Sequence, residues 1–191
     1  AAALLGVFII VDSRGRVSVL PKLSYPASSR LKWIYLAMGL CAAAVSTEAF
    51  TPLFGQRMIG LEPLVAGFLG ATISAGWSFA GVLSSRVTDE ARRRRMMLGG
   101  PVVIAASLLV TAVLQSLHPS GWSVLGWAIS LFVAGVGIGM SNPHFAVAIM
   151  GITTDEIQQL KAAGAIPVVS QISQVLAVAV GGLLVNMGLP S

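Results

Sequence analysis

Five long runs of almost uninterrupted apolar sequence, separated by short polar loops, dominate this chain. Their predicted bounds are residues 31–54, 63–83, 96–117, 122–149 and 163–187. Each run is close to or longer than the roughly 20 residues that an α-helix needs to cross a bilayer. The segment VVIAASLLVTAVL is apolar on every side, whereas a strand of a transmembrane β-barrel alternates apolar and polar residues. The pattern therefore predicts an all-α fold, a polytopic bundle of transmembrane helices.

The scarcity of charged residues supports a surface that faces lipid. Only 10% of the 191 residues are charged, while 55% are hydrophobic, and the mean hydropathy is +0.86. A soluble domain carries roughly 25% charged residues, because water must solvate its surface. The net charge of +5 fits the basic cytoplasmic loops of a membrane protein better than a surface for nucleic acid. We expect the lipid bilayer as a partner and no nucleic acid.

The distribution of basic residues predicts the topology. Residues 12–30 are rich in Lys and Arg, as is the loop between the second and third runs, whereas the loops after the first and third runs hold little basic charge. Strongly basic loops thus alternate with nearly neutral ones, as the positive-inside rule requires of an up-and-down bundle. We interpret residues 12–30 as a basic cytoplasmic loop. Residues 1–11 are apolar but too short to span a bilayer, so we interpret them as the end of a truncated transmembrane helix.

Enzyme chemistry finds little support in the sequence. The one cysteine, Cys41, lies inside an apolar run, and the chain has no Cys/His spacing typical of zinc. An intramembrane serine protease would need Gly-x-Ser-Gly and a histidine on a different helix. The nearest string is GMSN at residues 139–142, and His144 follows it on the same predicted helix. We expect no enzyme activity, no metal and no cofactor.

Glu48 is the most distinctive polar residue within the predicted spans. It lies in VSTEAFTPLF, towards the outer end of the first complete helix. A carboxylate in hydrocarbon is costly, so such residues commonly mark proton or cation pathways. One interpretation is a proton-coupling acid in a water-filled cavity. The other is an acid near the outer interface, either hydrated or paired with Arg57.

Further polar residues within the spans are candidates for lining a substrate cavity. Asn142 and His144 flank Pro143 in the fourth run, and Gln171 and Gln174 share a face of the fifth. Such side chains need either a cavity or a hydrogen-bonding helix beside them, since lipid offers no partner. Both interpretations stay open.

Small residues at regular spacing predict close helix packing. Gly135, Gly137 and Gly139 form a GxGxG string, but they lie inside a spanning run rather than between a strand and a helix. Gly70, Ser74 and Ser78 repeat every four residues. We interpret both patterns as packing stripes, which let helix backbones approach closely.

The layout around the second run resembles a known family of transporters. FTPLFGQRMIG is followed by an apolar helix that ends in FAGVLSSRVTDEARRRR, and the glycine-rich fourth run ends in NPH. This succession is similar to the second half of a major facilitator superfamily transporter, particularly of bacterial drug exporters. The family's cytoplasmic loop signature is roughly G-x-x-x-D-R-x-G-R-R. Gly81 and Arg86 match it, Ser85 replaces the acid, and the basic residues come late, at Arg92, Arg93, Arg94 and Arg95.

The resemblance implies a fold and a function. It implies the C-terminal half of a major-facilitator-type fold, in which the first and fourth helices of the half line a central cavity and carry Glu48 and Asn142. It implies secondary active transport of a small-molecule substrate, with proton-coupled export by alternating access as our preferred version. The missing N-terminal half would be a partner, and the location a bacterial plasma membrane. The alternative is a non-functional or partner-dependent membrane fragment.

Overall fold

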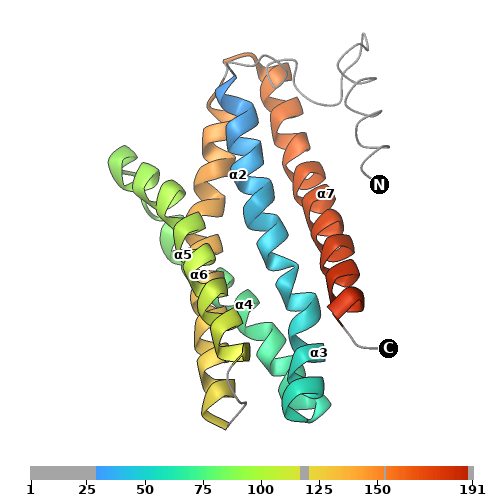
Figure 1. The fold of residues 1–191 in the computed structure, drawn as a ribbon. Coiled ribbons are helices and arrows are strands. Elements are labelled where there is room, and N and C mark those ends of the chain that lie inside the picture. Colours follow the sequence, from blue (N-terminus) through green and yellow to red (C-terminus); the bar gives the residue numbers. More distant parts are fainter. Residues whose placement is uncertain (1–28, 117–120, 153, 189–191) are drawn as a thin grey trace. The chain divides into compact units, whose positions relative to one another are not determined.

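A computed structural model describes residues 29–116, 121–152 and 154–188 of the chain. This part of the chain is helical and contains no strand. The helices, coloured along the sequence in Figure 1, are α2 (Arg30–Val45), α3 (Thr47–Ile59), α4 (Pro63–Ser84), α5 (Glu90–Ser116), α6 (Gly121–Met150) and α7 (Glu156–Gly188). The predicted all-α bundle is confirmed. The truncated helix expected at residues 1–11, and all but the end of the 12–30 loop, lie outside the described residues.

Five helical stretches are long and apolar enough to cross a membrane. They are Arg30–Ile59, formed by α2 and α3 together, Pro63–Ser84, Glu90–Gln115, Trp122–Met150 and Glu156–Met187. Large apolar side chains are exposed along them, among them Phe68, Leu109 and Leu183, each at least 60% exposed. Water would penalise such a surface, whereas acyl chains do not. The exposed face of these helices is therefore suited to lipid or to further transmembrane helices.

Two helices begin earlier than the sequence predicts. The α5 helix begins at Glu90 rather than Met96, and α7 begins at Glu156 rather than at residue 163. Asp89 accepts a hydrogen bond of 2.9 Å from the backbone N–H of Arg92, and Asp155 accepts one of 2.9 Å from that of Ile157. Such caps satisfy N–H groups that a helix leaves unpaired at its start. Hydropathy finds only the apolar part of a span, so it misses these polar first turns.

Replacing the Asp155 cap is expected to loosen the start of α7. Asp155→Ala removes the acceptor for the N–H groups of Ile157 and Gln158, which lie 2.9 and 3.3 Å from its carboxylate. The loss should be about 1 kcal/mol, as for other helix caps. Amide hydrogen exchange of the purified protein should be faster over the first turn of α7 and unchanged at the start of α5. Equal exchange in both proteins would contradict the capping role.

The chain falls into two compact units, which we describe separately. Within the described residues, the first unit comprises 29–43, 145–152 and 154–188, and the second comprises 44–116 and 121–144. In the first unit α2 packs against α7. The Tyr35 hydroxyl donates a hydrogen bond of 2.9 Å to the carbonyl of Ala162. Gly39 lies so close to Ser173 that a Cβ on the glycine would be 2.6 Å from Oγ. The small residue therefore favours this close approach of the two helices.

In the second unit α3 and α4 form a helical hairpin. Gly60 ends α3 with a φ of 70°, a left-handed conformation that suits glycine, and its N–H donates to the carbonyl of Gln56 at 3.0 Å. The chain then turns into α4, which begins with Pro63. Along the hairpin the ring of Pro52 lies against Gly70, where a Cβ would be 3.1 Å from Cγ.

The glycines of the GxGxG string place α6 between α4 and α5. A Cβ on Gly135 would overlap the carbonyl oxygen of Ile73 in α4, and one on Gly139 would overlap that of Trp77. Gly137 points the other way, and its Cβ would be 2.8 Å from the carbonyl oxygen of Gly100 in α5. Residues two apart lie on nearly opposite sides of a helix, so the alternation serves two neighbours. This packing agrees with our interpretation of the string.

Hydroxyl groups join these packed helices. Ser84 donates a hydrogen bond of 2.7 Å from α4 to the carbonyl of Gly139 in α6. Thr111 of α5 and Ser130 of α6 share another of 2.7 Å, and both side chains are buried. Each such bond contributes on the order of 0.6 kcal/mol in a membrane protein. The hydroxyls add specificity to an interface whose energy comes mainly from close packing.

Candidate functional site

Glu48 lies in the first turn of α3 and contacts a hydroxyl on α4. Ser74 Oγ donates to the two carboxylate oxygens of Glu48, at 3.0 and 3.1 Å, and both side chains are half-buried. A carboxylate is also favoured at the positive end of a helix, where backbone N–H groups are unpaired. The pair connects α3 to α4 at a point within two membrane-spanning stretches. The Glu48 carboxylate is thus directed toward Ser74 of α4.

The backbone at Glu48 is irregular. The helix is interrupted at Ser46, and the N–H of Ala49 bonds back to the Ser46 carbonyl at 3.1 Å in a tighter turn. Pro52 has no N–H to donate to the carbonyl of Glu48, four residues earlier. Breaks in transmembrane helices are tolerated where polar groups and neighbouring helices satisfy the backbone. The acid therefore lies at the most irregular part of this span.

The sequence left open an ion pair between Glu48 and Arg57. Within the described residues Glu48 forms no ion pair with Arg57, and the carboxylate contacts Ser74 instead. Ser74 belongs to the stripe with Gly70 and Ser78 that we interpreted as packing. Sequence spacing alone gave no signal for its contact with Glu48, because the two residues come from different helices.

His144 is buried between α6 and α5. Its exposed fraction is 5%, and its Nε2 atom lies 3.4 Å from the sulfur of Met96. This contact favours the helix-packing interpretation of His144, since the ring reaches a neighbouring helix. Asn142 lies one residue before Pro143 in the same helix and is half-buried.

The two candidate glutamines of α7 differ in exposure. The side chain of Gln171 is exposed, and that of Gln174 is half-buried. An exposed amide in the middle of a spanning stretch needs water or another protein segment beside it, because lipid cannot satisfy it. This placement favours a cavity or a partner surface on that side of α7.

The residues of the loop motif are divided between two helices and a short turn. Gly81 lies within α4, Arg86 lies in the turn, and the arginines at 92–95 form part of the first turns of α5. The prediction that these four arginines lie in a loop is thus wrong, because the Asp89 cap starts the helix before them. Arg93 donates to the carbonyl of Val87 at 3.2 Å and pairs with Glu90 at 3.8 Å. The basic cluster is therefore ordered on a helix end.

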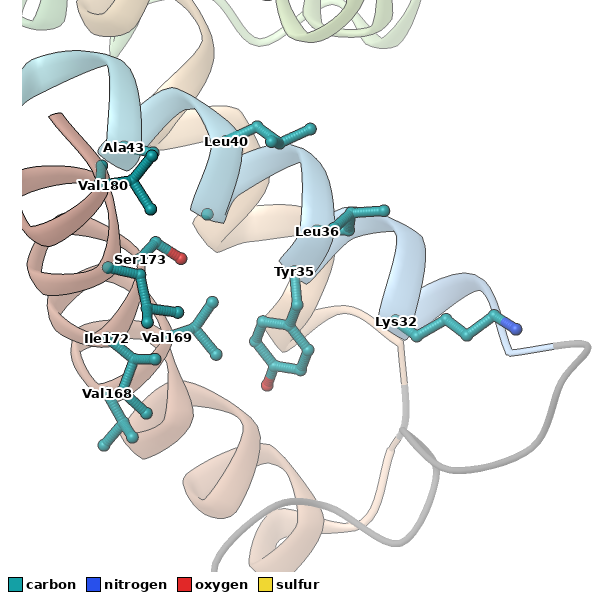
Figure 2. A pocket seen from close by; sticks show the side chains of 13 residues that line it. Lys32, Tyr35, Leu36, Leu40, Ala43, Val168, Val169, Ile172, Ser173 and Val180 are labelled. Atoms are coloured by element: carbon teal, nitrogen blue, oxygen red, sulfur yellow. The ribbon is translucent and has the colours of Figure 1, made fainter. Parts of the chain in front are cut away.

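A groove of about 610 Å³ runs between α2 and α7 in the first unit. It was not anticipated from the sequence. The sticks in Figure 2 show Lys32 at one end of the α2 side and Tyr35 pointing between the helices. The lining is apolar apart from three side chains, and comprises Lys32, Tyr35, Leu36, Gly39, Leu40, Ala43, Val168, Val169, Ile172, Ser173, Leu176, Ala177 and Val180. Neither Gln171 nor Gln174 lines it.

The sequence profile of the Major Facilitator Superfamily matches residues 2–182. The chain belongs to the major facilitator superfamily. It is a multi-pass membrane protein from a family of transporters rather than enzymes, and its five spanning stretches form part of a major-facilitator-type bundle. The match covers nearly the whole chain, so the family assignment applies to both compact units.

Two curated relatives support this assignment. Each is named a probable multidrug-efflux transporter, one from Mycobacterium tuberculosis strain CDC 1551 and one from strain H37Rv. Each is 37% identical to the chain over 186 residues, which is 97% of the chain and 39% of the relative. The chain thus spans well under half the length of these relatives. No solved structure matches the chain significantly.

Proposed function

We propose that the chain forms part of a proton-coupled exporter of small lipophilic molecules in a bacterial cell membrane. The observation that carries the proposal is the Glu48 carboxylate, which accepts hydrogen bonds from Ser74 beside a tightened helical turn within a spanning stretch. Ionisable groups inside membranes commonly serve ion or proton pathways. The names of the two relatives support multidrug efflux as the direction and substrate class.

In the proposed mechanism two halves of the transporter rock about a central site, so that the site opens to one side of the membrane at a time. Protonation of Glu48 would change its interaction with Ser74 and so shift the balance between the two states. Asn142 in the second unit, and Gln171 and Gln174 in the first, are the residues proposed to contact substrate. The contact of His144 with Met96 favours a packing role for His144.

We propose that a further segment of the transporter packs beside this part of the chain. The match covers 39% of the length of each relative, and the exposed Gln171 amide needs a polar or protein neighbour in the membrane. The N-terminal half expected from the family resemblance supplies that neighbour.

A vesicle assay tests the proposed function. The complete protein is reconstituted into liposomes, and uptake of fluorescent lipophilic dyes is followed after an inside-acid pH gradient is imposed. We expect accumulation that stops when a protonophore is added, together with proton release on addition of dye. Dye accumulation that does not depend on the pH gradient would contradict the proposed proton coupling. If no dye accumulates, the proposed export of lipophilic molecules is wrong.

A further inference from the structure

The length of the groove between α2 and α7 is close to the thickness of the hydrocarbon layer of one bilayer leaflet. Its lining on α2 extends from Lys32 to Ala43, and that on α7 from Val168 to Val180. At 1.5 Å per residue, the α2 side is roughly 17 Å long. The hydrocarbon core of a bilayer is about 30 Å thick, so one leaflet contributes about 15 Å. A single acyl chain aligned with the helices would fit this length.

The walls of the groove suit hydrocarbon rather than a polar solute. The lining residues repeat at helical spacing along one face of each helix and are predominantly Leu, Ile, Val and Ala. The Tyr35 hydroxyl already donates to the carbonyl of Ala162 within the first unit. The Ser173 hydroxyl lies at the closest approach to Gly39. The interior therefore offers few groups to bind a polar ligand.

The charge of the groove is confined to the end at which α2 begins. Lys32 lines that end, and its ammonium lies 5.1 Å from the ring centre of Trp33. Trp33 is 61% exposed, and Arg30 beside it is also exposed. Tryptophan and lysine at the end of a spanning helix mark the membrane–water interface. The opposite end, at Ala43 and Val180, carries no charged lining residue.

We propose that this groove binds an anionic phospholipid of the surrounding bilayer, with an acyl chain between α2 and α7 and the phosphate at Lys32. A positive mouth above an apolar slot complements a molecule with an anionic head and a hydrocarbon tail. Basic residues near a membrane surface favour anionic lipids, each by an amount equal to about a fivefold change in affinity. The bound lipid would hold α2 against α7 within the first unit.

Lipid retention by the purified complete protein tests the site. Native mass spectrometry compares phosphatidylglycerol with phosphatidylcholine carrying the same acyl chains. We expect preferential retention of phosphatidylglycerol, reduced about fivefold in Lys32→Gln and restored in Lys32→Arg. Lys161→Gln is the matched control, because Lys161 lies on α7 outside the groove, and it should retain phosphatidylglycerol as the unmodified protein does.

A second pair of variants tests the acyl-chain part of the groove. Ala177→Phe fills the groove and should reduce retention of both lipids, whereas Ala179→Phe, on α7 but not in the lining, should not.

Equal retention of the two lipids by the unmodified protein would overturn the proposal. Equal effects of Lys32→Gln and Lys161→Gln on retention would also overturn it. Displacement of phosphatidylglycerol by inorganic phosphate would instead indicate a simple anion site, and displacement by an exported dye a substrate site. If Ala177→Phe destabilises the protein without changing lipid retention, another helix occupies the groove. These outcomes leave the proton-coupling assay unaffected.

Discussion

Gly135→Ala is expected to prevent normal assembly of α4, α5 and α6, although it adds only one methyl group. The added Cβ would overlap the carbonyl oxygen of Ile73 and lie 2.8 Å from the backbone nitrogen of Trp77. These are backbone atoms of α4, so no side-chain rotation relieves the clash. The helices must separate, and the paired contact at Gly76, whose Cβ position overlaps the carbonyl oxygen of Phe132, separates with them.

The expected loss of stability is ~3 kcal/mol or more, at the upper end of the cost of overpacking. Thermal unfolding of the purified protein in detergent, followed by size-exclusion chromatography, measures it. Gly67→Ala is the matched control on α4, because a Cβ at Gly67 meets no atom within 4 Å. That change should be neutral or slightly stabilising, since alanine is the better helix former. If the two variants unfold at the same temperature, the α4–α6 approach is not as close as described.

The sequence predicted the helices because lipid imposes a simple rule on them. A spanning helix must be apolar for about 20 residues, and this requirement can be read without knowing what lies beside the helix. The same rule explains the errors at the helix starts. Asp89 and Asp155 begin α5 and α7 in polar sequence, where hydropathy gives no signal. The family layout and the packing role of the GxGxG string were also accessible, because both depend on local spacing.

Only part of the candidate site could be predicted from the sequence. Glu48 could be found by itself, since an acid in an apolar run stands out. Its contact with Ser74 depends on the register between α3 and α4, which the Gly60 turn and the approach of Pro52 to Gly70 determine. The groove between α2 and α7 depends on helices far apart in the chain. No local pattern encodes such a register, so these features required the structure.

Glu48→Gln is expected to abolish the link between proton movement and substrate movement in the complete transporter. Glutamine keeps the size of the side chain and can still accept a hydrogen bond from Ser74, but it cannot carry the exchangeable proton. Coupling between two sites commonly amounts to about 5–150-fold in affinity. In the variant, the effect of a pH gradient on dye accumulation should disappear, while dye binding remains.

Two further variants separate proton coupling from folding. Ser74→Ala removes the hydroxyl that donates to both carboxylate oxygens, so it should weaken coupling without abolishing it. Glu62→Gln changes an exposed acid just before α4 and should transport as the unmodified protein does. The measurements are proton release on dye addition and dye accumulation in the same vesicles, with thermal stability as the check on folding. Coupled proton release that persists in a folded Glu48→Gln protein would exclude Glu48 as the proton site, and the pair with Ser74 would then serve only to join α3 to α4.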